Sequence, residues 1–166
     1  NSKQVGIASG ASTDHGNMLA AIAFYDAMRA EGIKPIIGME AYIHNSEDLG
    51  DKTTRQRYHL CLYAKNDIGY KNLMFLSSQA YMHGFYYYPR INKQLLRENS
   101  EGLVCSAACL QGEVNWHLNT QNERNVKNGA KGYEGAKAVA LEYKEIFEDD
   151  FYLEIMRHGI GDQHFV

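Results

Sequence analysis

The sequence has little of what marks a specialised class of protein. Its 166 residues include only 2 prolines, 1 tryptophan and 3 cysteines, and the net charge is −3. Without a basic excess, composition alone does not predict nucleic-acid binding, although local basic segments stay compatible with it. The opening residues do not resemble a signal peptide, and no apolar run is long enough to cross a bilayer. We therefore expect a cytoplasmic protein that does not contact membranes.

The cysteines exclude a disulfide scaffold and a zinc finger. Cys61, Cys105 and Cys109 cannot all pair within one chain, and no Cys-x-x-Cys spacing is present. We expect reduced thiols. The hydrophobic share of 45% and the chain length fit one globular domain with its own core.

Strand-like and helix-like segments alternate along the chain, which predicts an α/β fold with a parallel sheet or barrel. In such folds functional groups gather at the carboxyl ends of strands. The segment 5–12 is a poor strand, because Ala, Ser and Gly dilute its apolar residues. The other predicted strands cover 34–43, 58–64, 102–108 and 151–156, the predicted helices cover 17–31, 66–82, 92–99, 110–119 and 133–148, and the segments 44–57, 84–91 and 120–132 are predicted loops.

The first predicted helix, 17–31, has signals at both ends. Asn17 can cap its start, and Gly32 follows as a stop. Apolar residues at helical spacing predict which side packs against the core. These residues are Leu19, Ile22, Ala23, Ala27 and Ala30.

Metal-ligand side chains lie on or beside several predicted strands. His15 follows Asp14 in the stretch "TDHGNM", Glu40 and His59 lie on or beside neighbouring strands, and Cys109 follows another. Imidazole, carboxylate and thiolate groups are the ligands that zinc uses in proteins. One ligand from each strand end is also how sites in barrels are assembled.

The same side chains also have purely structural interpretations, because no local motif links them. His15 could begin a helix with Asp14 as the partner of the helix dipole. Glu40 could pair with a Lys or Arg, His59 could be a hydrogen-bonded core histidine, and Cys109 could be a small buried apolar group.

Tyrosine is abundant, with 12 residues, and three of them lie in "GFYYYPR" at 84–90. A run of this kind is typical of a half-buried strand or loop edge whose hydroxyls contact water. Because Tyr and Arg favour interfaces, this run and the 44–57 loop are also candidate contact surfaces.

Six stretches, in this order, resemble the PHP (polymerase and histidinol phosphatase) domain of bacterial replicative DNA polymerase III alpha subunits. The resemblance covers nearly the whole chain. The stretches are "TDHGNM", "GIKPIIGMEAYI", "YHLCLYAKNDIGYKNL", "GFYYYPRI", "SEGLVCSAACLQGE" and "FYLEIMRHGI".

The resemblance implies a distorted (β/α) barrel and a divalent-metal cofactor, zinc or manganese. It implies His15, Glu40, His59 and Cys109 as metal ligands. Asp14 and His158 would lie close behind them. The family pattern has two further ligand-bearing strands, an opening His-x-His strand and a later Asp-x-His strand. No His-x-His precedes residue 15, and we expect the later strand to lie beyond this chain. We therefore expect a fragment of a PHP domain with one metal at most, and weak or absent phosphoesterase activity when it is isolated.

The resemblance implies a parent DNA-directed DNA polymerase, whose nucleotidyl-transfer carboxylates lie outside this chain. In that parent the domain could be a metal-dependent phosphoesterase or 3′–5′ exonuclease. It could instead be a non-enzymatic scaffold that binds the separate proofreading subunit. The implied partners are DNA and other polymerase III subunits. A free-standing phosphatase of the histidinol-phosphate type is a further alternative, which "GFYYYPR" and "ACLQGE" argue against.

Overall fold

The structure is a computed structural model that describes residues 6–161 and 163, so Val5 in the predicted weak strand lies outside it. The described part contains six strands and six α-helices. The strands are β1 (Ser9–His15), β2 (Lys34–His44), β3 (Tyr58–Ala64), β4 (Arg90–Asn92), β5 (Leu103–Ser106) and β6 (Phe151–Tyr152). The helices are α1 (Ala21–Ala30), α2 (Asp67–Met82), α3 (Lys93–Glu98), α4 (Glu113–Leu118), α5 (Glu123–Lys127) and α6 (Gly132–Phe147).

The strands form one mixed sheet in the order β1-β2-β3-β5-β6, and β4 pairs with the end of β2. The expected α/β class is confirmed, but a wholly parallel sheet is wrong. β2/β3 and β3/β5 are antiparallel, whereas β1/β2, β2/β4 and β5/β6 are parallel. The β2–β3 connection contains no helix to carry the chain back across the sheet, so β3 returns antiparallel to β2. Within the described residues β1 and β6 are opposite ends of this path, and the sheet is open.

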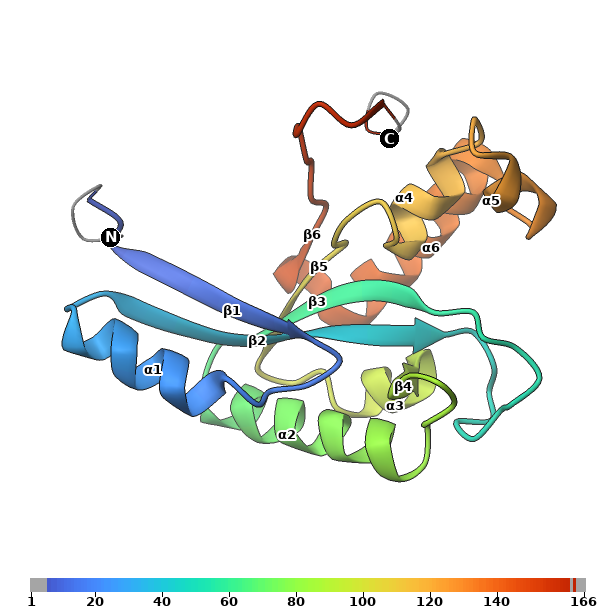
Figure 1. Ribbon diagram of the computed structural model, residues 1–166. Coiled ribbons are helices and arrows are strands. Elements are labelled where there is room, and N and C mark those ends of the chain that lie inside the picture. Colours follow the sequence, from blue (N-terminus) through green and yellow to red (C-terminus); the bar gives the residue numbers. More distant parts are fainter. Residues whose placement is uncertain (1–5, 162, 164–166) are drawn as a thin grey trace.

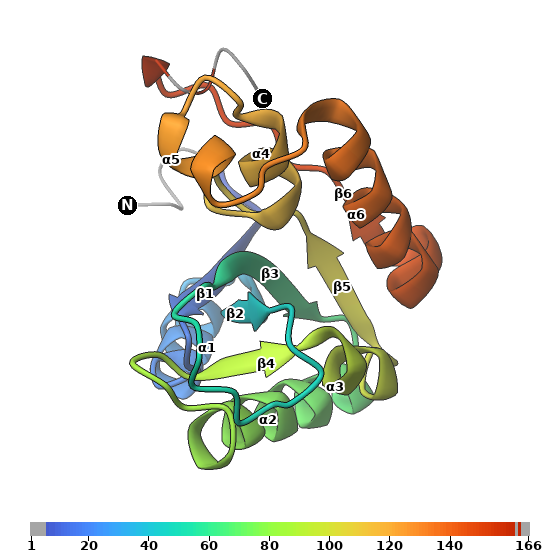
Figure 2. The same ribbon diagram turned by 90° about the vertical axis from the view of Figure 1, so that its right-hand side faces the viewer.

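The helices lie in two groups. Figure 1 shows α1 and α2 along one side of β1, β2 and β3, with α4, α5 and α6 clustered beyond β5. After a quarter turn, Figure 2 shows β5 leading from the first group to the second. The core joins both groups, because Leu73 and Leu76 of α2 and Tyr143 of α6 belong to one buried apolar cluster. The sheet contributes buried residues to the same cluster, among them Met39, Ala41, Ile43, Leu60 and Leu62.

Helix α2 confirms the prediction for 66–82. The Asn66 side chain accepts a hydrogen bond from the backbone N–H of Gly69 at 3.0 Å, as an N-cap does. Its buried residues recur at helical spacing and face the sheet. They are Gly69, Leu73, Leu76 and Ala80.

Helix α1 corrects the prediction for 17–31, because it begins at Ala21 rather than beside Asn17. Asn17 makes a tight turn instead: its Oδ1 accepts from the N–H of Leu19 at 2.9 Å. The predicted core stripe is exposed, with Leu19 at 89% and Ile22 at 71%. The side that packs inward carries Ala21, Phe24 and Met28, which are buried or half-buried.

Three further predictions are corrected, two of them by strand pairing. The weak segment forms β1, because a parallel partner, β2, supplies its backbone hydrogen bonds. The predicted loop at 84–91 ends in β4, whose residue Arg90 pairs with Tyr42. The predicted exposed connection at 120–132 contains the short helix α5, capped by Asn122. In the described residues, no helix is both long and apolar enough to span a bilayer.

Candidate metal centre

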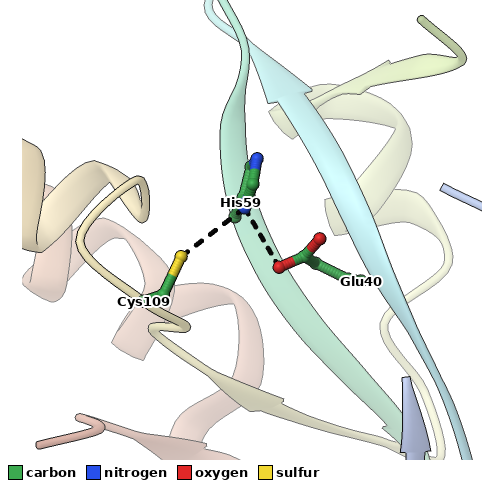
Figure 3. A group of neighbouring side chains, drawn as sticks. All are labelled: Glu40, His59 and Cys109. Atoms are coloured by element: carbon green, nitrogen blue, oxygen red, sulfur yellow. Dashed lines mark hydrogen bonds and ion pairs between the residues drawn. The ribbon is translucent and has the colours of Figure 1, made fainter. Parts of the chain in front are cut away.

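The pairing of β1, β2 and β3 brings three of the predicted ligands together. The register places His15 of β1 opposite Glu40 of β2, and it places Tyr42 of β2 opposite His59 of β3. Alternate residues of a strand share a face, so Glu40 and His59 project from the same side of the sheet. Ligand donor atoms of Glu40, His59 and Cys109 all lie within 4.8 Å of one another. Figure 3 shows these side chains converging from two strands and the loop after β5.

His59 lies at the centre of this cluster. Its Nδ1 is 3.0 Å from Glu40 Oε1 and 3.5 Å from Cys109 Sγ. Burial lowers the pKa of His59, but its hydrogen bonds with Cys109 and Glu40 outweigh burial and raise that pKa to about 9. Burial raises the pKa of Cys109, yet the hydrogen bond with His59 leads to a net lowering. A lowered pKa favours the thiolate, which is the form that binds metals.

Cys109 reaches His59 because of the unusual backbone of the segment before α4. Ala108 has a φ of 58°, a left-handed conformation that a non-glycine residue adopts at a cost of about 1–2 kcal/mol. The N–H of His59 donates to the carbonyl of Gln111 at 3.0 Å, so the segment is fastened to β3. A Cβ on Gly112 would lie 1.9 Å from the carbonyl oxygen of Ala107, so only glycine fits there. Backbone strain of this kind, beside a cluster of candidate ligands, is typical of functional sites.

The stretch around His15 is built in a similar way. The N–H of Gly16 donates to the Glu40 carbonyl at 2.8 Å, which holds the end of β1 on β2. Asp14 Oδ2 accepts from the N–H of Ala20 at 3.1 Å, so this carboxylate serves the start of α1. His15 Nε2 is 3.3 Å from Glu40 Oε2, and its side chain is 75% exposed. His15 therefore flanks the cluster on its solvent side.

The contacts of Glu40 and His59 fit both a hydrogen-bonded core pair and metal ligation. Glu40 contacts two histidines, His15 and His59, within ion-pair distance. Two of their buried atoms have no hydrogen-bond partner among the described residues. Glu40 Oε2 is 3.3 Å from His15 Nε2, and His59 Nε2 is not the ring nitrogen that faces Glu40 and Cys109. Each such polar atom costs about 1–3 kcal/mol unless something binds it.

Atom spacing and ligand chemistry both suit one divalent ion. Ligand atoms at about 2.0–2.3 Å from a tetrahedral zinc ion lie roughly 3.3–3.8 Å apart. The 3.0 Å and 3.5 Å separations around His59 Nδ1 are close to that range. Oxygen, nitrogen and sulfur donors together favour zinc over magnesium or calcium.

His158 lies outside this group of donor atoms. It is on the exposed segment that follows β6, and its backbone N–H donates to Gln163 Oε1 at 2.7 Å. The predicted place close behind the ligands therefore has no support from the described contacts of His158.

Glu113 is a buried polar residue that the sequence analysis did not single out. It is 2% exposed, and it accepts hydrogen bonds from Asn45, Lys93 and Tyr143 at 2.7 to 3.1 Å. It opens α4, and its position four residues after Cys109 in "ACLQGE" was the available signal. Its network joins the end of β2 to α3, α4 and α6.

Comparison with known proteins identifies the family of this chain. The family model described as "PHP domain" matches residues 1–158. The DNA polymerase III subunit alpha of Campylobacter jejuni is 69% identical over 99% of the chain, and that of Helicobacter pylori strain J99 is 70% identical over 99%. The DNA polymerase III subunit alpha of Borreliella burgdorferi is 46% identical over 93% of the chain. The chain spans 13–14% of the length of these relatives. The chain belongs to the PHP domain family.

Proposed function

We propose that this chain is the PHP domain of a bacterial DNA polymerase III alpha subunit and that it binds a divalent metal, zinc or manganese, there. The main support is the convergence of Glu40, His59 and Cys109, whose ligand donor atoms lie within 4.8 Å of one another. The names and identities of the relatives support the parent and its part in DNA replication. A cytoplasmic location and contacts with DNA and other polymerase subunits belong to the same proposal.

In this proposal Glu40, His59 and Cys109 are the ligands, and His15 is close enough to be a fourth. A bound divalent ion would supply Lewis acidity and lower the pKa of a bound water for phosphoester hydrolysis. The protein's part is to hold Glu40 and His59 on paired strands and to present Cys109 as a thiolate. His15, exposed on the outer side, is placed to contact an incoming substrate or to turn inward.

We propose a phosphoesterase or 3′–5′ exonuclease activity for the complete parent and little for these 166 residues alone. The family pattern adds a His-x-His strand and an Asp-x-His strand to the site. No His-x-His occurs in residues 1–166, and the Asp-x-His strand is proposed to belong to the rest of the parent. A PHP-type barrel is likewise proposed for the complete domain, whose remaining strands would extend the open sheet described above.

Metal binding tests the proposal in the purified alpha subunit that carries this chain. We expect bound zinc or manganese by elemental analysis, and a loss of tenfold or more in metal affinity for Cys109→Ala and His59→Ala. Cys61→Ala is the matched control. Cys61 is a nearby buried thiol, and burial and the charge of Glu40 raise its pKa to about 11, away from the thiolate form. Absence of metal from the wild type, or equal loss in Cys61→Ala and Cys109→Ala, would count against the site.

A second function, docking of a proofreading subunit, is supported by exposed aromatic residues. Phe85 and Tyr87 are 50% and 54% exposed, whereas Tyr86 and Tyr88 in the same run are half-buried. We expect Phe85→Ser with Tyr87→Ser to weaken binding of that subunit to the parent. Tyr133→Ser on α6, where the side chain is 68% exposed, is the control. Unchanged affinity in the double variant would exclude this surface.

A further inference from the structure

Arg57 is held between two tyrosine rings just before β3. Its guanidinium carbon lies 3.6 Å from the centre of the Tyr88 ring and 5.4 Å from the centre of the Tyr42 ring. The two rings contact each other edge to face, with centroids 5.7 Å apart. Contacts of this kind hold the planar guanidinium in one orientation.

This Arg57–Tyr42–Tyr88 group is next to the candidate metal centre. The Tyr42 ring lies 5.2 Å from the His59 ring, centroid to centroid. The same ring also packs against Gly16, where a Cβ would approach Tyr42 to 2.9 Å. The guanidinium is therefore one ring away from a ligand side chain and close to the turn that follows His15.

The charge of Arg57 is not neutralised by the described residues. In this part of the chain no carboxylate lies within ion-pair distance of Arg57, whereas Lys93 contacts both Glu113 and Glu142. Arg57 Nε is buried without a hydrogen-bond partner. A guanidinium that is held by aromatic rings and has no carboxylate partner among the described residues, beside a candidate metal centre, favours an anionic ligand.

We propose that Arg57 is a phosphate-binding residue of this site. It would donate charge-assisted hydrogen bonds to a non-bridging phosphate oxygen, for which the guanidinium fork is well shaped. This inference rests on the proposed function, since it names the group that a phosphoester substrate would present beside the metal. The shared chemistry is a phosphate oxygen, which a DNA phosphodiester or a free phosphate could supply.

The test is a binding titration with the complete alpha subunit, using inorganic phosphate and, separately, a short oligothymidylate. Each probe is titrated with zinc present and after zinc removal. We expect Arg57→Gln to weaken phosphate binding about tenfold or more, with zinc content and melting temperature unchanged. Arg57→Lys, which retains charge but not the fork, should bind with intermediate affinity. Weakening for both probes identifies a site that accepts the DNA phosphodiester, and weakening for inorganic phosphate alone identifies a free-phosphate site.

Arg55→Gln is the matched control. Arg55 is an exposed arginine two residues earlier, 3.7 Å from the centre of the Tyr87 ring, and it donates a hydrogen bond to the Tyr87 hydroxyl. Its variant should bind phosphate within about twofold of the wild type.

The inference is overturned if the wild type does not bind phosphate, if Arg57→Gln and Arg55→Gln are weakened equally, or if both Arg57 variants bind as the wild type does. A lower melting temperature with unchanged phosphate affinity would reduce Arg57 to a structural brace. Should Arg57→Gln fail to fold, Arg57→Lys decides, and wild-type affinity in it overturns the proposal. Failure of the proposed function is detected separately, as absence of bound metal and of phosphoester hydrolysis. The titration without zinc still measures how much Arg57 contributes to phosphate affinity.

Discussion

Single residues contribute very differently to the stability of this chain, as Lys93 and Lys127 show. Lys93 lies 2.9 Å from Glu113 and 2.7 Å from Glu142, with Lys93 13% and Glu113 1% exposed at the side chain. Lys127 lies 3.4 Å from Glu123, with side chains 76% and 87% exposed. Removing one member of a buried pair leaves the other charge without compensation, whereas water compensates an exposed one.

We expect Lys93→Ala to lower the free energy of unfolding by about 3 kcal/mol. Lys127→Ala, its control, should change it by about 0.5 kcal/mol or less. Urea denaturation followed by circular dichroism measures both. Similar losses in the two variants would show that the Glu113 network contributes no more than a surface pair.

The β1–α1 turn is one of the connections between elements that support the site. Gly16 has a φ of 69° and packs against Tyr42 and Pro89, where a Cβ would lie 2.9 Å and 3.0 Å from ring atoms. Gly32, after α1, has a φ of 70° but no atom within 4 Å of its Cβ position. Substituting either glycine by alanine would strain the backbone, and at Gly16 the added Cβ would also clash with neighbouring side chains.

We predict that Gly32→Ala lowers the free energy of unfolding by about 1 kcal/mol, because alanine disfavours the left-handed backbone conformation. Gly16→Ala should cost about 3 kcal/mol, because Tyr42 must also move. Thermal and urea unfolding compare the two variants. Equal destabilisation would mean that the Tyr42 ring moves aside at no cost. The close packing beside His15 would then contribute nothing to the free energy of unfolding.

At the scale of the whole molecule, two buried histidines couple folding to pH. Burial, followed by the charge of Arg90, lowers the pKa of His44. Burial also lowers the pKa of His117, whose Nδ1 accepts from the N–H of Lys131. Below pH ~6.5 the unfolded chain binds protons at these two positions more readily than the folded chain does. Their contribution to stability is therefore fully present above that pH and is lost as pH falls toward the lowered values.

We expect the double variant His44→Gln, His117→Gln to lose less stability between neutral pH and pH ~5 than the wild type does. Urea unfolding at a series of pH values measures the slope in both proteins. The comparison with the wild type cancels the contribution of the other histidines. An unchanged slope would show that neither imidazole has a lowered pKa in the folded protein.

The sequence predicted elements well where a local signal was complete. Helix α2 has its cap at Asn66 and four buried residues at helical spacing, and strand β3 has a run of apolar residues. It failed where pairing partners decide. β1 is too rich in small residues to be recognised alone, yet it forms because β2 supplies hydrogen bonds along its length. In α1 apolar residues occur on more than one side of the helix. Only contact with the sheet decides that Ala21 is buried and Ile22 is exposed.

The sequence by itself determined the ligand types and the family motifs, because these depend on residue identity and order along the chain. It could not show that Glu40, His59 and Cys109 meet, since 69 positions separate the first from the last. That meeting is decided by strand register and by the left-handed Ala108, both of which are tertiary features. Tertiary structure also placed Arg57 one ring from His59, since residues of β2 and the 84–90 run complete that group. Contacts between distant segments depend on the fold as a whole, and no local pattern encodes them.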